Sequence, residues 1–124
     1  MNGYSVSIKE TSRNLTAKER IAIKDTTSAV KLDEATQVES VTINPSMYAV
    51  LSIHNDKSDN PDYENYIVVD KNGTNFVTGS QSFWTSFIDI WVEMENEDEE
   101  WSVLVYRHPS KNYKGKEFIT CAIQ

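Results

Sequence analysis

The chain has 124 residues, a formal net charge of −7 and 39% hydrophobic residues. This length predicts one domain, residues 1–124, with a single hydrophobic core. No apolar run is long enough to cross a membrane and no charged, apolar leader opens the chain, so we expect a cytosolic protein. The single cysteine, Cys121, cannot form an internal disulfide, which agrees with a reducing compartment.

Charge is distributed unevenly along the chain. Six acidic and six basic residues cancel within residues 1–53. Residues 54–100 carry twelve acidic groups against two lysines, whereas residues 101–124 carry four basic groups against one glutamate. This distribution argues against a uniformly cationic polyanion binder, but it leaves room for a local cationic groove near the end of the chain.

The first half of the chain predicts strands joined by polar connections. Alternation of apolar with polar residues predicts half-buried strands over residues 4–8 and 19–24. Residues 25–40 are polar and threonine-rich, so we expect an ordered connection in which residues 31–36 could form a short helix. Residues 46–53 predict a strand with Tyr48, Val50 and Ser52 on one face and Ala49, Leu51 and Ile53 on the other.

The next segments predict a hairpin. Residues 54–65 combine turn residues with acidic ones, and residues 66–70 form a strongly β-prone run. Asn72-Gly73 is typical of a tight hairpin turn because both residues accept positive φ at low cost. Residues 75–78 then predict the return strand.

Gly79 to Met94 has the clearest pattern in the chain. At 100° per residue its aromatic and aliphatic side chains form one broad stripe, with Asp89 and Glu93 on the opposite face. Ser80 or Ser82 can cap the amino end. We therefore predict one long amphipathic helix, at about residues 80–95, that packs on a β-sheet.

Strands follow this helix. The acidic residues 95–100 end it, residues 101–107 predict a strand, residues 108–116 a basic turn and residues 117–123 a last strand. A mainly β chain whose one long helix lies between strands 3 and 4 predicts an OB-fold-like, partly open barrel. A sandwich, or a sheet crossed by one helix, would give the same order of elements and stays open.

Catalytic and metal-binding motifs are missing from the sequence. It has two histidines, no P-loop, no dinucleotide-binding glycines and no His-x-x-x-His. Residues 56–64 alternate oxygen ligands as a calcium loop does, but Pro61 stands in place of the required glycine and Ile67 in place of the bidentate glutamate. We therefore expect no enzyme activity, no metal site and no cofactor.

Cations and aromatic rings alternate around the predicted basic turn. Cations neutralise phosphates, while rings stack on unpaired bases at ~1–3 kcal/mol per base. This pattern favours a single-stranded nucleic-acid site, which cations on the segment at residues 19–24 and tyrosines of the middle strands could extend. The alternative is that the tyrosines border the core and the lysines only keep a loop soluble. The candidate residues are Arg20, Lys24, Tyr48, Tyr66, Tyr106, Arg107, Lys111, Tyr113, Lys114 and Lys116.

Several features occur together in the last two-thirds of the chain. A strand ending at Ile53 precedes an acidic hairpin, a strand into Asp70-Lys-Asn-Gly73 and a serine-capped helix. A Ser110-Lys…Lys-Gly115-Lys turn and an aromatic-led strand, Phe118 to Ile123, follow. In this architecture the chain resembles the small single-stranded-DNA-binding proteins of protein-primed phages.

The resemblance implies an OB-like protein that binds single-stranded DNA without sequence preference. Such a protein coats displaced strands during phage DNA replication in the host cytoplasm, without catalysis. By position, Lys114, Lys116 and Phe118 would line the binding groove.

The acidic residues Glu93–Glu100 suggest a different function. Acid at the carboxyl end of a helix opposes the macrodipole and costs a few tenths of a kcal/mol per charge, which points to some use for the charge. The alternative function is an acidic phage protein that inhibits a host nucleic-acid-binding enzyme. The same run could instead contact replication proteins or simply keep the helix end soluble. A virion assembly subunit is a third possibility.

Overall fold

The computed structural model describes residues 3–109 and 116–124. Within that part the chain is mainly β, with three α-helices and strands in two sheets that form no closed barrel. The chain divides into two compact units, residues 1–30 with 46–79 and residues 31–45 with 80–124. One domain over residues 1–124 stays a prediction.

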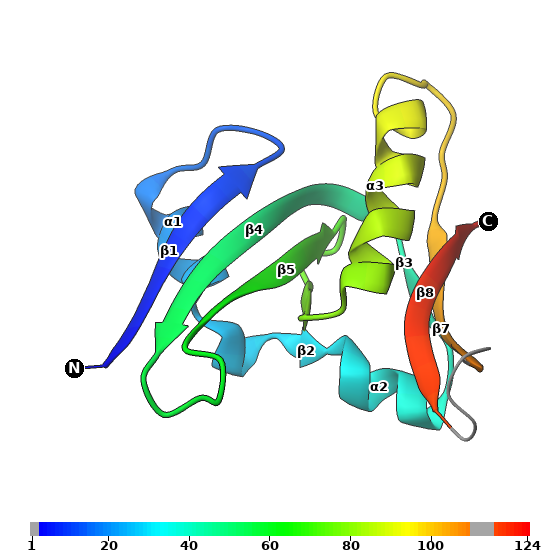
Figure 1. Cartoon of the computed structure of the whole chain (residues 1–124). Helices are drawn as coiled ribbons and strands as arrows, with labels where there is room; N and C mark the ends of the chain where they lie inside the picture. The colour runs from blue at the N-terminus through cyan, green and yellow to red at the C-terminus, as the bar shows by residue number, and fades with distance from the viewer. Residues whose placement is uncertain (1–2, 110–115) are drawn as a thin grey trace. The chain divides into compact units, whose positions relative to one another are not determined.

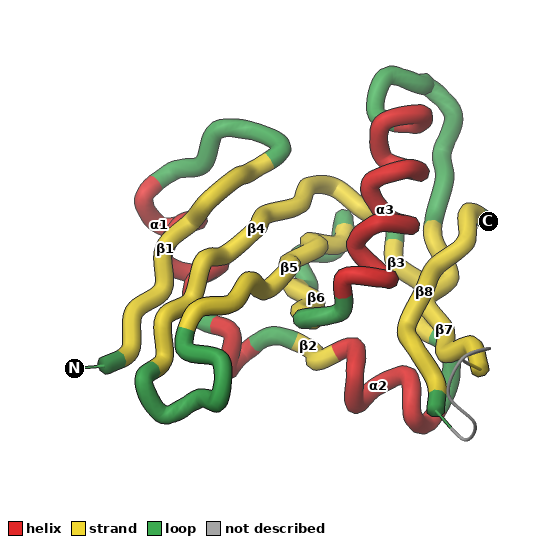
Figure 2. Tube along the Cα trace, in the orientation of Figure 1, coloured by secondary structure: helices red, strands yellow, loops and turns green. Residues whose placement is uncertain are grey.

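The first unit is a five-stranded sheet with one α-helix (Figure 1). Figure 2 shows the long strands β1, β4 and β5 side by side. The full strand order of the sheet is β1-β4-β5-β6-β2. The chain also forms a 3-10 turn, Thr26–Ser28, before β2. The elements are β1 (Tyr4–Thr11), α1 (Ala17–Lys24), β2 (Val30–Lys31), β4 (Pro45–Asn55), β5 (Asp62–Asp70) and β6 (Asn75–Thr78).

One face of this sheet carries the core that the alternation predicted. Leu51 and Ile67 are fully buried and Ile53 is 3% exposed, in a cluster with Val77 and with Ile23 from α1. The opposite face of β4 and β5 is also buried at Val50, Tyr66 and Val68, so these strands are apolar on both sides rather than on one.

The prediction of a strand over residues 19–24 is wrong, because these residues form α1. Thr16 begins the helix with a capping box: its Oγ1 accepts from the backbone N of Glu19 at 3.2 Å, and its own N donates to the Glu19 carboxylate at 2.9 Å. The alternation misled because residues two apart lie on nearly opposite sides of a helix. Ile23 is buried, whereas Ile21 is 71% exposed.

His54, near the end of β4, joins the β4–β5 hairpin through two carboxylates. Its Nδ1 lies 2.7 Å from Asp62 and its Nε2 lies 2.6 Å from Asp56. The hydrogen bond with Asp62, then that with Asp56, raises the pKa of His54 above its ordinary value of 6.5. A neutral ring has only one N–H and can satisfy only one of these carboxylates.

The protein should therefore lose stability as the pH rises through the pKa of folded His54. A group whose pKa is raised by folding contributes fully below its unfolded pKa, about 6.5, and no longer contributes above the folded value. In urea unfolding between about pH 6 and pH 9, the advantage of wild type over His54→Gln should shrink steadily. Parallel pH curves for the two proteins would show that the imidazolium does not hold the hairpin.

The second unit is a three-stranded antiparallel sheet, in the order β3-β7-β8, with two helices. A helix, α3, lies where the long amphipathic helix was predicted, but it is one of three α-helices in the described residues. Ser80 caps it by accepting from the N of Phe83 at 3.2 Å, and Ser82 donates instead to the backbone O of Ile119 at 2.8 Å. The elements are α2 (Leu32–Val38), β3 (Val41–Ile43), α3 (Gln81–Met94), β7 (Val103–Pro109) and β8 (Glu117–Ile123).

Phe83 and Phe87 are the fully buried residues of α3 and anchor the core of the second unit. Their rings stack with centroids 5.8 Å apart, and Phe87 also stacks on Trp84 at 5.4 Å. Ser86 hydrogen-bonds Thr120 across to β8 at 3.0 Å.

In the described part of the chain no helix is both long and apolar enough to span a bilayer.

Candidate nucleic-acid interface

Two aromatic rings lie at the end of the β7–β8 hairpin that is next to its turn. His108 and Phe118 are directly opposed in the antiparallel register, and their ring centroids lie 5.4 Å apart at an interplanar angle of 37°. His108 is exposed and Phe118 is 38% exposed. Lys116, also exposed, comes just before β8. Accessible rings can stack on a base, and a cation beside them can contact the phosphate of the same nucleotide.

The basic turn that joins these two strands contains the candidates Lys111, Tyr113 and Lys114. All three lie outside the described residues. Lys116 and Phe118 are thus the described members of the groove that the phage resemblance implies.

Two of the donors of Arg107 are already used in contacts with α2. Its Nε donates to Thr36 Oγ1 at 3.2 Å and its Nη2 donates to the backbone O of Asp33 at 2.5 Å. The Thr36 hydroxyl in turn donates to the O of Leu32 at 2.7 Å. The guanidinium points to α2 because odd-numbered residues of β7, such as the buried Val105, face the core of the second unit.

The three candidate tyrosines lie in different environments. Tyr66 is 5% exposed, so its ring is covered and we exclude it from the candidate site. Tyr48 is half-buried and its hydroxyl donates to Glu10 on β1 at 3.0 Å. Tyr106 is half-buried and lies two residues before His108, on the same face of β7. Tyr106 therefore remains the best placed of the three to extend the ring pair.

Arg20 and Lys24 lie on α1 instead of on a strand, and both are exposed. On a helix these two cations lie closer together than they would on a strand. Residues four apart are neighbours on a helix, with Cβ atoms about 5–6 Å apart, whereas four residues of strand span about 13 Å. The guanidinium of Arg20 donates to the backbone O of Leu15 at 2.7 Å.

Titratable groups in the described residues form no metal-binding cluster, and two of them have strongly shifted pKa values. No group of three His, Cys, Asp or Glu side chains in the described chain could hold a metal ion. Burial raises the pKa of the Cys121 thiol to about 12, so this thiol is not a ready nucleophile. Arg13 and the Thr16 backbone lower the pKa of Glu19 to about 2, which keeps the Glu19 carboxylate ionised as the helix cap.

A depression beside Arg20 could not be found from the sequence. It is lined by Ile8, Thr11, Asn14, Leu15 and Arg20, which come from β1, the following loop and α1. The sequence shows only a polar stretch here. The sequence signal nearest to this depression is the Thr16-x-x-Glu19 capping signature, which predicts where the helix beside it starts.

No protein-family model, no curated protein and no solved structure matches the chain.

Proposed function

We propose that the chain binds single-stranded DNA without sequence preference, and without catalysis, through the end of the β7–β8 hairpin. The observation that carries the proposal is the opposed, accessible ring pair of His108 and Phe118 next to Lys116. Bases stack on these rings, and phosphates are neutralised by Lys116 with Lys111 and Lys114 of the turn. Tyr106 and Tyr113 extend the stacking surface.

Strand connectivity supports a partly open, OB-like barrel as the scaffold. β3 and β4 are separated only by Asn44; β3 pairs with β7 while β4 neighbours β5, and β5 pairs with β6. We count β3 and β4 as one strand, which is followed by β5 and β6. The chain then returns through α3, and β7 pairs with β3. This order of four strands is that of a Greek key. In OB-folds the loop between the last two strands is one of those that bind oligonucleotides, and the β7–β8 turn occupies that place in the chain.

The biological role that we propose comes from the phage resemblance. A small protein that binds by stacking and charge alone can coat displaced strands of any sequence during phage DNA replication in the host cytoplasm.

An acidic interaction protein remains the second candidate, since one observation favours it. Glu93 and residues 95–100 are all exposed, and no cation of the described chain forms an ion pair with them. Such uncompensated charge can attract a basic surface on a host nucleic-acid-binding enzyme or a replication protein.

Fluorescence anisotropy with labelled oligothymidylate and with a duplex of equal length tests the proposal. In low-salt buffer we expect saturable binding of the single strand and weaker binding of the duplex, because paired bases cannot stack on the ring pair. Binding of oligothymidylate should also quench tyrosine and tryptophan emission. A chain that ignores both oligonucleotides, yet forms a complex with a basic protein that is lost when Glu95, Glu97 and Glu99 become glutamine, would favour the second candidate.

A further inference from the structure

The depression beside α1, here called the Arg20 pocket, has the composition of a small-ligand site. It is an open depression of about 440 Å³, lined by two apolar side chains, Ile8 and Leu15, and three polar ones, Thr11, Asn14 and Arg20. All five belong to the first unit. Sites for small molecules are commonly about 300–1,000 Å³ and combine apolar walls with a few polar groups that orient the ligand.

The loop that forms the pocket wall is held in place by its own hydrogen bonds. Ser12 pairs with Tyr48 of β4 in both directions, since its N donates to the Tyr48 O and its Oγ accepts from the Tyr48 N, each at 3.0 Å. The Thr11 hydroxyl donates to the O of Arg13 at 2.6 Å. A wall that is already ordered loses little conformational entropy when a ligand binds.

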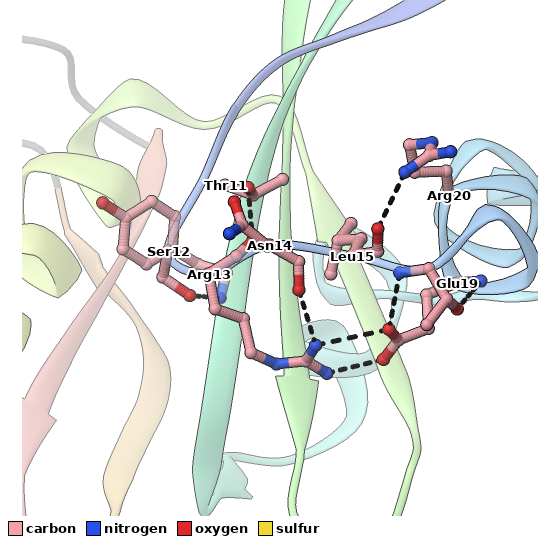
Figure 3. A network of polar contacts seen from close by, with 9 residues as sticks. Thr11, Ser12, Arg13, Asn14, Leu15, Glu19 and Arg20 are labelled. Carbon is pink, nitrogen blue, oxygen red and sulfur yellow. Dashed lines mark hydrogen bonds and ion pairs between the residues drawn. The ribbon is translucent and has the colours of Figure 1, made fainter.

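Two arginines flank this loop, and only one of them has an acidic partner. Arg13 forms a bidentate ion pair with Glu19, with Nη–Oε distances of 2.7 and 3.3 Å. In Figure 3 this pair lies on one side of the loop and Arg20 on the other. Arg20 uses one N–H on the O of Leu15, which fixes its position, and no carboxylate of the described chain pairs with it.

The charge of the site selects an anion. The pocket lining contains no acidic residue, and Lys24 stands one helical turn after Arg20 on α1. A guanidinium fork fits phosphate oxygens, and a phosphomonoester carries close to two negative charges at neutral pH. Ile8 and Leu15 then offer apolar contact to the rest of the ligand.

We propose that the Arg20 pocket binds a small phosphomonoester with a compact apolar part, of the nucleoside 5′-monophosphate class. The phosphate accepts hydrogen bonds from Arg20 and Asn14, and the nucleoside rests on Ile8 and Leu15. The inference goes beyond the proposed function, because it concerns a free small ligand in the first unit and holds whether or not the hairpin binds DNA.

Amide-resolved NMR titration with deoxythymidine 5′-monophosphate tests the proposal. We expect the nucleotide to cause saturable chemical-shift changes at the amides of residues 8–20, and deoxythymidine to cause none. Inorganic phosphate should compete partially with the nucleotide. Arg20→Met should weaken binding at least tenfold. The matched control is Lys18→Met, which removes one charge from the same helix outside the pocket lining and should leave affinity within about twofold.

Three outcomes would overturn the site. They are no saturable shift at millimolar ligand, shifts that lie outside residues 8–20, and equal losses in Arg20→Met and Lys18→Met, which would indicate only general charge attraction. Circular dichroism of each variant establishes that α1 remains folded, and Arg20→Lys, which keeps the charge without the fork, should bind with intermediate affinity.

Discussion

Replacing Phe87 with alanine is expected to lower the free energy of unfolding by about 3–5 kcal/mol. The Phe87 side chain is fully buried and contacts the rings of Phe83, Trp84 and Trp91, with centroids 5.8, 5.4 and 6.0 Å away. Removing the ring loses its transfer free energy and leaves a cavity that α3 cannot close without moving. Urea unfolding followed by tryptophan emission measures the change.

The matched control for Phe87 is Val92→Ala on the same helix. Val92 is 57% exposed, so its truncation should change stability by no more than about 0.5 kcal/mol. A Phe87→Ala loss below about 1 kcal/mol, or one equal to that of Val92→Ala, would contradict the assignment of α3 as the anchor of the second unit.

Replacing Phe118 with alanine is expected to weaken binding of oligothymidylate by roughly 5- to 150-fold. This range corresponds to ~1–3 kcal/mol for one lost base-stacking ring. Phe118→Tyr keeps the ring and should keep most of the affinity. Anisotropy titration at a fixed low salt concentration measures both variants.

Ile123→Ala provides the control on β8. Ile123 is 49% exposed and apolar, but it pairs with Val103 at the opposite end of the hairpin from Phe118. We expect unchanged affinity for this variant. If Phe118→Ala and Ile123→Ala bind alike, the ring pair is not the stacking surface.

Elements with strong, redundant signals could be predicted from the sequence. α3 combines a broad apolar stripe with a serine cap and lies at Gln81–Met94, and the last strand lies at Glu117–Ile123 as predicted. Leu51, Ile53 and Ile67 are buried on the face that strand parity predicts for the core. These features depend on residues close together in the chain.

One local segment was predicted wrongly, and features that depend on distant residues could not be predicted. Alternation of Ile21 and Ile23 favoured a strand, but the Thr16–Glu19 capping box started a helix, and one buried isoleucine was enough to anchor it. The role of Arg107 is set by Asp33 and Thr36, more than 70 residues earlier. Sequence composition identifies a cation, but only tertiary contacts decide whether its donors are already used.

The salt dependence of oligothymidylate binding tests the central claim most directly. Each phosphate neutralised on a single strand contributes about −0.7 to the slope of log affinity against log salt. Lys114→Gln with Lys116→Gln should therefore flatten the slope by about 1.4, whereas the matched double variant at Lys57 and Lys71 should leave it unchanged. A wild-type slope near zero, or equal flattening by both double variants, would contradict a single-strand site on the β7–β8 hairpin.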